Sequence, residues 1–358
     1  MRNRVRMSLS KQVKVFDELL QSSGPMLALA PMQDVTDLPF WKVINKRGGA
    51  DVYFTEYFRV RAGSRLEKPI LKSITENPTG QPVVAQMIGN SIPDLIRTAR
   101  ELQHFPIAAV DLNLGCPAPV VYKKCAGGGL LRDTERVDKI LGALRESIET
   151  RFTVKTRIGF DSPSTFDKLI PIFAKHNLDL LTVHGRTVKE MYRSPVHYDF
   201  IKRASEEVNC PVLANGNIYS ATKAESVLKE TNTHGLMIGR GIIRNPWMFN
   251  QIRQHLSRES LTFPSGHEVL KYVEELFETT APDNYNELSH VQKMKKYMNY
   301  FGLGVDADGQ FLHGIRRAQN KLEFFAVCRQ HLNHKRAMPL EPFTPKLHSK
   351  DVVAGCHT

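Results

Sequence analysis

The chain has 358 residues, 41% of them hydrophobic and 24% charged, which supports a folded core and excludes a disordered protein. No apolar run approaches the ~18 residues that cross a bilayer, so we expect a soluble, cytoplasmic protein rather than an integral membrane protein. Lysine and arginine outnumber aspartate and glutamate by 49 to 37, and this basic balance favours a polyanionic partner, of which nucleic acid is the commonest.

The first residues, MRNRVRMSLSK, are basic and contain no acidic side chain. They lack the apolar core of about 7–15 residues that a secretory signal requires. An organellar transit peptide is an alternative interpretation, and we favour a basic N-terminal extension over residues 1–24.

Apolar, strand-like runs recur along the next part of the chain, and most of them precede a helix-compatible segment. Two such segments are IPDLIRTARELQHF (92–105) and TERVDKILGALRESI (134–148), whereas RVRAGSRLEKPILKS, between the second and third runs, looks irregular. The eight runs are MLALAPM (26–32), DVYFTEY (51–57), PVVAQMI (82–88), AAVDLNLG (108–115), TVKTRIG (153–159), LLTVHG (180–185), PVLANG (211–216) and GLMIGR (235–240).

This alternation predicts a parallel sheet covered by helices. Eight units in about 230 residues fit a closed TIM (β/α)₈ barrel better than an open sheet. A doubly wound sheet normally carries a glycine-rich fingerprint after its first strand, but the corresponding turn here reads APMQDVTD and contains no glycine. We therefore predict an α/β protein with a TIM barrel over residues 25–257.

The pattern changes after the barrel. Apolar positions at helical spacing, such as Val269, Val273 and Leu276, predict helices and therefore a smaller all-helical domain over residues 265–335. The tail over residues 336–358 contains prolines and no clear periodicity, so we expect it to be extended or loosely ordered. The three predicted helices cover residues 266–280, 287–302 and 308–332.

The cysteines are widely spaced and form no CxxC pair. This pattern is typical of a reducing compartment and not of a disulfide framework or a zinc site, so we expect no bound metal. The cysteines are Cys116, Cys125, Cys210, Cys328 and Cys356.

Polar residues follow most of the predicted strands. In a TIM barrel, functional residues gather at the carboxyl ends of the strands. Each residue alone could be a satisfied core polar group, but their shared position on one rim predicts a site there. They are Gln86, Asn113, Cys116, Lys155, Arg157, His184, Arg186, Asn215, Gly239 and Arg240.

The last two predicted strands indicate phosphate binding. NGNIYS (215–220) and GRGIIRNP (239–246) place glycines and backbone N–H groups where helices begin, and Arg240 adds a positive charge. Lys155 and His184 are residue types suited to the negative charge that develops on a reduced flavin. The apolar residues 30–32 offer an edge for such a ring.

Cys116 stands between Gly115 and Pro117 at the end of the fourth predicted strand, where simple strand packing is not expected. Most single cysteines are small buried hydrophobic residues, and that interpretation suits Cys210 and Cys328. For Cys116 we favour an exposed acid, because a thiol with a pKa near 8.5 is mostly protonated at neutral pH.

Together these elements resemble the dihydrouridine synthase family over roughly residues 26–257, and the helical segment resembles the family's RNA-binding domain more loosely. The motifs follow the family's order and are specific as a set. They are LALAPMQDVTDLPFW (27–41), QPVVAQMIGN (81–90), DLNLGCP (111–117), GGGLLRD (127–133), VKTRIGFD (154–161), VHGRT (183–187), VLANGNI (212–218) and MIGRGIIRNPWMF (237–249).

The resemblance implies FMN in the barrel mouth, NADPH as the reductant and reduction of uracil, with Cys116 as the proton donor. It implies RNA, most commonly tRNA, as the partner, and we expect a monomer. The residues expected to hold FMN are Pro31, Met32, Gln86, Lys155, His184, Asn215, Gly216, Asn217, Gly239 and Arg240, and those expected on the substrate side are Asn113, Arg157 and Arg186.

Two loops depart from the family pattern. Pro119 and Val120 stand where the family commonly carries a basic pair, and Met191-Tyr192 stands where a glycine–tyrosine pair is usual. Three alternatives therefore stay open: the same chemistry on ribosomal RNA, the reduction of a free pyrimidine, and a non-catalytic RNA-binding barrel.

Overall fold

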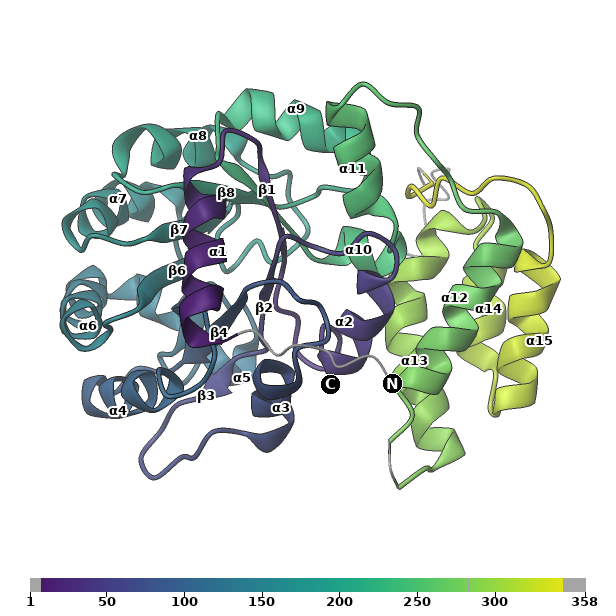
Figure 1. Ribbon diagram of the computed structural model, residues 1–358, viewed down its shortest axis with the longest axis horizontal. Helices are drawn as coiled ribbons and strands as arrows, with labels where there is room; N and C mark the ends of the chain where they lie inside the picture. The colour runs from purple at the N-terminus through teal and green to yellow at the C-terminus, as the bar shows by residue number, and fades with distance from the viewer. Residues whose placement is uncertain (1–7, 283, 344–358) are drawn as a thin grey trace.

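The computed structural model describes residues 8–282 and 284–343. A closed barrel of parallel strands forms one part of the molecule, and a bundle of helices packs beside it (Figure 1). The strands are β1 (Met26–Leu29), β2 (Val52–Phe54), β3 (Phe58–Arg59), β4 (Val83–Ile88), β5 (Ala109–Leu114), β6 (Arg151–Arg157), β7 (Leu180–His184), β8 (Val212–Asn215) and β9 (Gly235–Ile238).

The strand order confirms the predicted TIM barrel. Neighbours run β2-β1-β9-β8-β7-β6-β5-β4, and the pairing of β2 with β4 closes the ring. Within the described residues every strand pairing is parallel. Each of the eight predicted runs overlaps one barrel strand, with β6 beginning two residues before its run, and the short β3 is an addition that pairs only with the end of β4.

Helices cover the outside of the barrel (Figure 1). The two helical segments that the sequence predicted are α4 and α6. In the interval that looked irregular, residues 60–67 form no helix or strand, and α3 begins only at its end. The barrel helices are α2 (Leu38–Asn45), α3 (Lys68–Glu76), α4 (Ile92–Leu102), α5 (Pro119–Tyr122), α6 (Thr134–Ser147), α7 (Phe166–Lys175), α8 (Tyr198–Glu207), α9 (Ala221–Thr231), α10 (Arg240–Arg244) and α11 (Met248–Leu256), with 3₁₀ turns at Gly127–Arg132 and Pro163–Thr165.

A helix that the sequence did not predict, α1 (Leu9–Gln21), lies in the described part of the N-terminal extension. Its Phe16 is fully buried in a cluster with Ala28, Phe54 and other side chains from inside the barrel. Gln12 accepts a hydrogen bond from the backbone N–H of Val83 at 2.8 Å. This helix therefore plugs the amino end of the barrel, so the open mouth is at the opposite end.

The bundle contains α12 (Gly266–Thr279), α13 (Glu287–Phe301), a 3₁₀ turn (Gly302–Gly304), α14 (Gln310–Arg317) and α15 (Lys321–Leu332). The prediction of one helix over 308–332 is wrong, because the chain leaves the helical conformation at Ala318 (φ −56°, ψ 128°). Asn320 then caps a new helix by accepting the backbone N–H of Glu323 at 2.9 Å.

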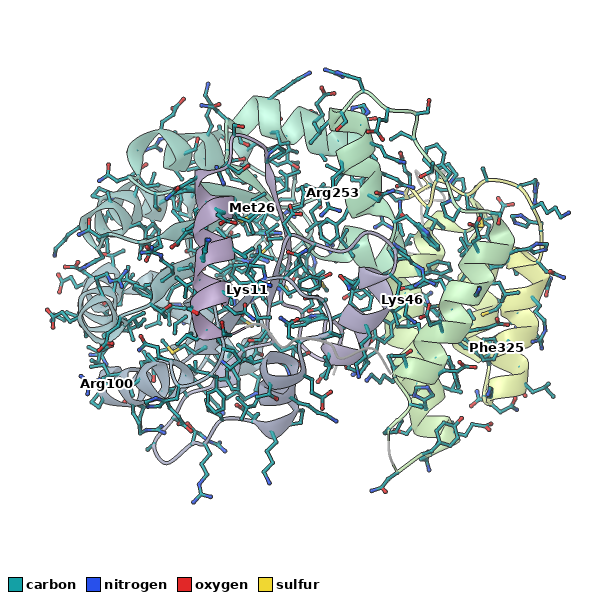
Figure 2. The ribbon with its side chains drawn as sticks, in the orientation of Figure 1. Lys11, Met26, Lys46, Arg100, Arg253 and Phe325 are labelled. Carbon is teal, nitrogen blue, oxygen red and sulfur yellow. The ribbon has the colours of Figure 1, made fainter. Side chains whose placement is uncertain are left out.

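The bundle contacts the barrel through several polar pairs. Lys46, labelled in Figure 2, forms an ion pair with Glu275 of α12, and Arg47 donates to the same carboxylate at 2.8 Å. On α13, the Tyr297 hydroxyl donates to the carbonyl of Val35 at 3.1 Å, in the loop that follows β1. The bundle thus reaches the loops at the barrel mouth.

Residues 336–343 of the predicted tail contain no helix, and Leu340 is buried with a left-handed backbone (φ 56°). Residues 344–358, with Cys356, lie outside the described residues, as do 1–7 of the extension. The predicted domain boundaries stay predictions. Nowhere in residues 8–282 and 284–343 is a helix both long and apolar enough to span a membrane.

Candidate active site

A cavity of about 680 Å³ opens at the carboxyl ends of the barrel strands and extends toward the bundle. It brings together most of the residues predicted from the sequence, whereas Gln86 and Arg186 lie behind its wall. The predicted residues that line it are Pro31, Met32, Asn113, Cys116, Lys155, Arg157, His184, Asn215, Gly216, Asn217, Gly239 and Arg240.

Cys116 lies on the cavity wall in the loop that follows β5. Its side chain is partly buried, and burial raises the pKa of the thiol above its usual range, so the thiol is protonated at neutral pH. The Tyr57 hydroxyl hydrogen-bonds the thiol. This hydrogen bond and the positive charge of Lys155 both lower the pKa of the thiol and so oppose the effect of burial. The predicted exposed acid is therefore half-buried, and it is held in its protonated form.

A chain of buried side chains holds this loop. Asp111 accepts a hydrogen bond from Gln86 at 2.7 Å, and Gln86 in turn accepts one from the Asn113 amide at 2.8 Å. Asn113 Oδ1 then accepts the backbone N–H groups of Gly115 at 3.0 Å and Cys116 at 2.9 Å. Gln86 is fully buried, so both ends of its amide are used inside the protein.

Lys155, His184 and Asn215 meet on the cavity floor. Asn215 Oδ1 accepts hydrogen bonds from Lys155 Nζ at 3.4 Å and from His184 Nδ1 at 2.8 Å. Asn215 can only accept through this oxygen, which places the imidazole proton on Nδ1 and leaves the Nε2 lone pair for Arg186, 3.4 Å away. Burial lowers the pKa of His184 well below its usual range, so the ring is neutral.

Lys155 is the stronger hydrogen-bond donor of this group. Burial, followed by the neighbouring charge of Arg157, lowers the pKa of the Lys155 ammonium to about 8. The ammonium group carries three protons, so it can bind Asn215 and still donate into the cavity. His184 has both ring nitrogens engaged, so its predicted role as a donor stays a prediction.

Two buried arginines brace the loops around the mouth. Arg157 is 2% exposed and donates to the carbonyls of Gly115 at 3.0 Å, Thr187 at 2.8 Å and Met191 at 2.8 Å. It therefore ties the Cys116 loop to the loop after β7. Arg186 donates to the Ser194 carbonyl at 2.7 Å within that second loop. Their predicted contacts with substrate stay predictions.

The opposite side of the cavity is apolar. Met32 is held by its backbone N–H, which donates to Thr36 Oγ1 at 2.7 Å. A Cβ atom at Gly239 would lie 2.9 Å from Met32 Sδ, so a larger residue there would push Met32 from its place. The loops after β8 and β9 also line the cavity, and there Arg240 donates to Asn217 Oδ1 at 3.1 Å.

Several lining residues were not singled out as site residues from the sequence. Tyr57 and Tyr219 each follow a strand, a position that could have identified them. Tyr192 lies beneath Arg240, whose guanidinium carbon is 4.5 Å from the ring centre. Arg244 and Tyr300 come from α10 and α13, and only the packing of the bundle against the barrel brings Tyr300 to the cavity.

Comparisons with known proteins agree across most of the chain. The family model for dihydrouridine synthase matches residues 28–335. A probable tRNA-dihydrouridine synthase of Helicobacter pylori is 35% identical over 322 residues, which cover 87% of this chain and 89% of that protein. A probable tRNA-dihydrouridine synthase of Rickettsia prowazekii is 33% identical over 289 residues, covering 79% of this chain and 87% of that protein.

Two further comparisons are more distant. The tRNA-dihydrouridine(16) synthase of Neisseria meningitidis is 28% identical over 280 residues, which cover 76% of this chain and 84% of that protein. A structure of morphinone reductase in complex with tetrahydroNAD superposes with a TM-score of 0.48 and 13% identity, covering 69% of this chain and 91% of that one.

Proposed function

Because the chain belongs to the dihydrouridine synthase family, we propose that it reduces the C5–C6 bond of uridine in tRNA, with FMN as its bound cofactor and NADPH as the reductant. The observation that carries the proposal is the position of Cys116, a protonated thiol in the same cavity as Lys155. The choice of tRNA rests on the names of the relatives in Helicobacter, Rickettsia and Neisseria.

The residues around the cavity fit FMN. Its volume, about 680 Å³, lies within the usual range for cofactor sites. Ala30, Pro31 and Met32 supply an apolar wall for a flat ring, Lys155 supplies a cation, and the loop with Arg240 supplies a second positive region. When bound, FMN would accept a hydride from NADPH and supply one to uracil C6.

Lys155 would hold the polar edge of the ring system. Because the pKa of Lys155 is about 8, the ammonium is mostly protonated at neutral pH and can stabilise negative charge nearby. Asn215 keeps the ammonium in place through its hydrogen bond at 3.4 Å.

Cys116 would complete the reaction. Hydride addition at C6 leaves an electron pair at C5, which must take up a proton. The S–H bond of Cys116 breaks and a C–H bond forms at C5, leaving a thiolate that the charges of Lys155 and Arg157 stabilise. Water would return a proton to sulfur after the product leaves.

The cavity mouth suits a base that has left its stack. A base within an RNA must be unstacked before it can enter a barrel. Tyr219 lines the cavity and keeps 38% of its surface exposed, so it offers an aromatic face to an RNA base, whereas the ring of Tyr192 is covered by Arg240. A substrate as small as free uracil would not need an outer face of this kind.

The test is an absorption spectrum of the purified protein, followed by incubation with NADPH and unmodified tRNA and measurement of dihydrouridine. We expect flavin bands and dihydrouridine. Flavin bands without dihydrouridine in tRNA would overturn the substrate assignment, and ribosomal RNA and free pyrimidines would then be assayed. A protein that binds no FMN, even when FMN is added, would overturn the proposed chemistry.

A further inference from the structure

Arg244, the last residue of α10, is a buried arginine whose guanidinium group is only partly paired. It lines the cavity and is 8% exposed. Its Nε donates to the backbone carbonyl of Tyr300 at 3.3 Å, but Nη1 is buried and has no hydrogen-bond partner within the described residues. A buried donor of a charged group that stays unpaired destabilises a fold, so this arrangement points to a ligand.

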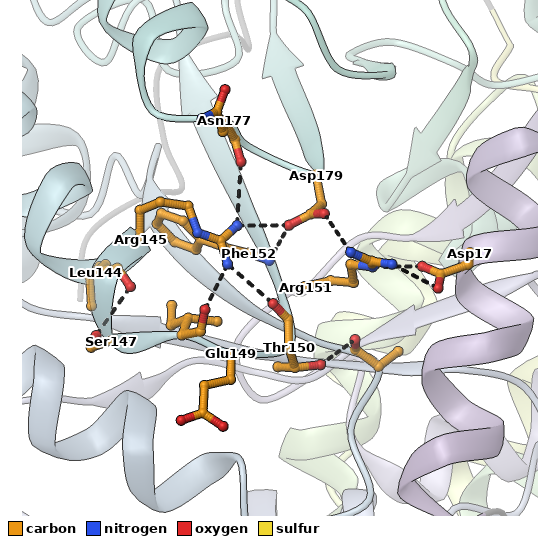
Figure 3. Close-up of polar contacts among 12 residues, drawn as sticks. Asp17, Leu144, Arg145, Ser147, Glu149, Thr150, Arg151, Phe152, Asn177 and Asp179 are labelled. Carbon is orange, nitrogen blue, oxygen red and sulfur yellow. Dashed lines mark hydrogen bonds and ion pairs between the residues drawn. The ribbon is translucent and has the colours of Figure 1, made fainter.

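Other arginines in this fold are paired differently. Arg145 donates to Asp179 at 2.9 Å (Figure 3). It also donates to the carbonyls of Ile148 at 2.7 Å and Thr150 at 3.3 Å. Arg157, in the cavity itself, is bound by three backbone carbonyls. The partly unpaired state of Arg244 is therefore a local feature and not a general property of buried arginines in this chain.

The electrostatic setting of Arg244 also favours an anion. Among the described residues no carboxylate lies within 4.0 Å of the guanidinium nitrogens of Arg244 or Arg240. Burial, followed by the charge of Arg240, lowers the pKa of Arg244 to about 10, so the group is still a cation at neutral pH. Two neighbouring cations without a counterion repel each other until an anion binds between them.

We propose that Arg244 and Arg240 together bind the phosphate monoester of the cofactor, with Arg244 as a phosphate contact supplied from the side of the bundle. This inference rests on the proposed function, because it takes the cofactor to be FMN. A terminal phosphate has three free oxygens and carries close to two negative charges, so it can occupy two guanidinium groups at once.

A phosphate within an RNA strand fits this position less well. Arg244 is buried, and Tyr300 and Pro342 line the cavity close to it along with the loops after β8 and β9. A phosphodiester is joined to nucleotides on both sides, so both would have to enter with it. The terminal phosphate of a small molecule needs room on one side only.

The test compares the dissociation constants of FMN and riboflavin, which differ by the phosphate alone, in wild-type apoprotein and in Arg244→Met. We expect the variant to lose at least about tenfold in FMN affinity, since a hydrogen bond to a charged group contributes that much, and to bind riboflavin within about threefold of wild type. Arg244→Lys keeps the charge but not the planar arrangement of donors, so its FMN affinity should lie between those of the wild type and Arg244→Met.

Arg145→Met is the matched control, because it removes a partly buried arginine that does not line the cavity and should leave the ratio of FMN to riboflavin affinity unchanged. Thermal unfolding of each apoprotein checks that it is folded, and the ratio of the two affinities stays informative for a variant that is merely less stable. A binding assay with tRNA completes the set.

The outcomes separate the two proposals. An unchanged affinity ratio in Arg244→Met would overturn this inference, and weaker tRNA binding in that variant would assign the arginine to RNA instead. A wild-type protein that binds riboflavin as tightly as FMN would overturn the inference while leaving the flavin assignment intact. A wild-type protein that binds neither flavin would overturn the proposed function and this inference together.

Discussion

Asn113 Oδ1 accepts the backbone N–H of Cys116 at 2.9 Å and so attaches the loop that bears the thiol to the end of β5. Behind Asn113 lie Gln86 and Asp111, which are both fully buried and hydrogen-bonded in series. The position of the proposed acid therefore depends on a side chain three hydrogen bonds away. Networks of this kind in a low-dielectric interior act as a unit.

The first prediction concerns the thiol itself. Cys116→Ala should bind FMN and be reduced by NADPH as the wild type is, because no part of the proposed cofactor contact is removed. It should reduce uridine about 10²–10⁴-fold more slowly, the usual contribution of a general acid. Stopped-flow absorbance measures flavin reduction, and single-turnover oxidation by tRNA measures the second step.

Cys125→Ala is the matched control for this experiment, since Cys125 is a free, exposed cysteine that does not line the cavity. It should behave as the wild type in both steps. If Cys116→Ala oxidised its flavin with tRNA at the wild-type rate, another group would have to supply the proton.

The second prediction concerns Asp111 as a positioning residue. The Asp111 carboxylate accepts hydrogen bonds from the Gln86 amide at 2.7 Å and from the Thr153 hydroxyl at 2.6 Å. Burial raises the pKa of this carboxyl to about 6. Asp111→Ala leaves both donors unpaired and should lower the free energy of unfolding by about 1–3 kcal/mol. It should also lower kcat, because the Cys116 loop loses its anchor, while KM changes little.

Asp111→Asn distinguishes positioning from charge. The side-chain oxygen of asparagine can still accept the hydrogen bond from Gln86. Its NH₂ group can donate to the Thr153 hydroxyl, because a hydroxyl oxygen is also an acceptor. It should therefore restore most of kcat. Thr153→Val, which removes the other partner of Asp111 and spares Gln86, should affect stability more than kcat. Equal losses in the Asn and Ala variants would rule out the positioning role.

The third prediction concerns Lys155. Replacing it with methionine keeps the length of the side chain and removes the cation, so reduction of bound flavin by NADPH should slow by at least about tenfold. The pKa of Lys155 is about 8, lowered by burial. Its proton is lost as the pH rises through that value, so the wild-type rate should fall above about pH 8. A rate in Lys155→Met with the same pH dependence would show that another group titrates.

The sequence predicted the barrel because its signals are local. Eight apolar runs of strand length separated by helical segments specify parallel strands, and polar residues at the ends of those runs necessarily meet on one rim. Cys116, Lys155 and Arg240 came together in one cavity for this reason. The first predicted run extended to residue 32, which is too far, because β1 ends at Leu29 and the next residues form the cavity wall.

The features that the sequence did not predict depend on contacts between distant segments. Helix α1 closes the barrel through Phe16, whose burial needs the whole ring of strands. Arg244 lies in the segment GRGIIRNP but was not singled out from the sequence, and its burial follows from the packing of α10 against α13. The break between α14 and α15 needed the cap at Asn320, a signal that helical periodicity alone conceals.

The last prediction uses a buried carboxyl beside the contact between bundle and barrel. Glu56 has a buried Oε1 without a partner in the described structure, and burial, followed by the charge of Asp37, raises the pKa of its carboxyl to about 7. In the unfolded chain the carboxyl has its ordinary pKa, so between about pH 4.5 and 7 the folded state binds the extra proton. The contribution of Glu56 to stability is therefore complete at low pH and is lost as the pH rises through about 7.

Wild-type protein should accordingly lose about 2 kcal/mol of unfolding free energy from this group between pH 5 and 7, measured by urea denaturation at constant ionic strength. Glu56→Gln stays neutral throughout, so its unfolding free energy should lack that decline, and the two proteins should differ most at the higher pH. Glu76→Gln, a change in an ion pair on the surface, controls for net charge and should retain the wild-type slope. The same slope in wild type and Glu56→Gln would mean that Glu56 ionises normally, and that the loop after β2 is more open to water than its burial indicates.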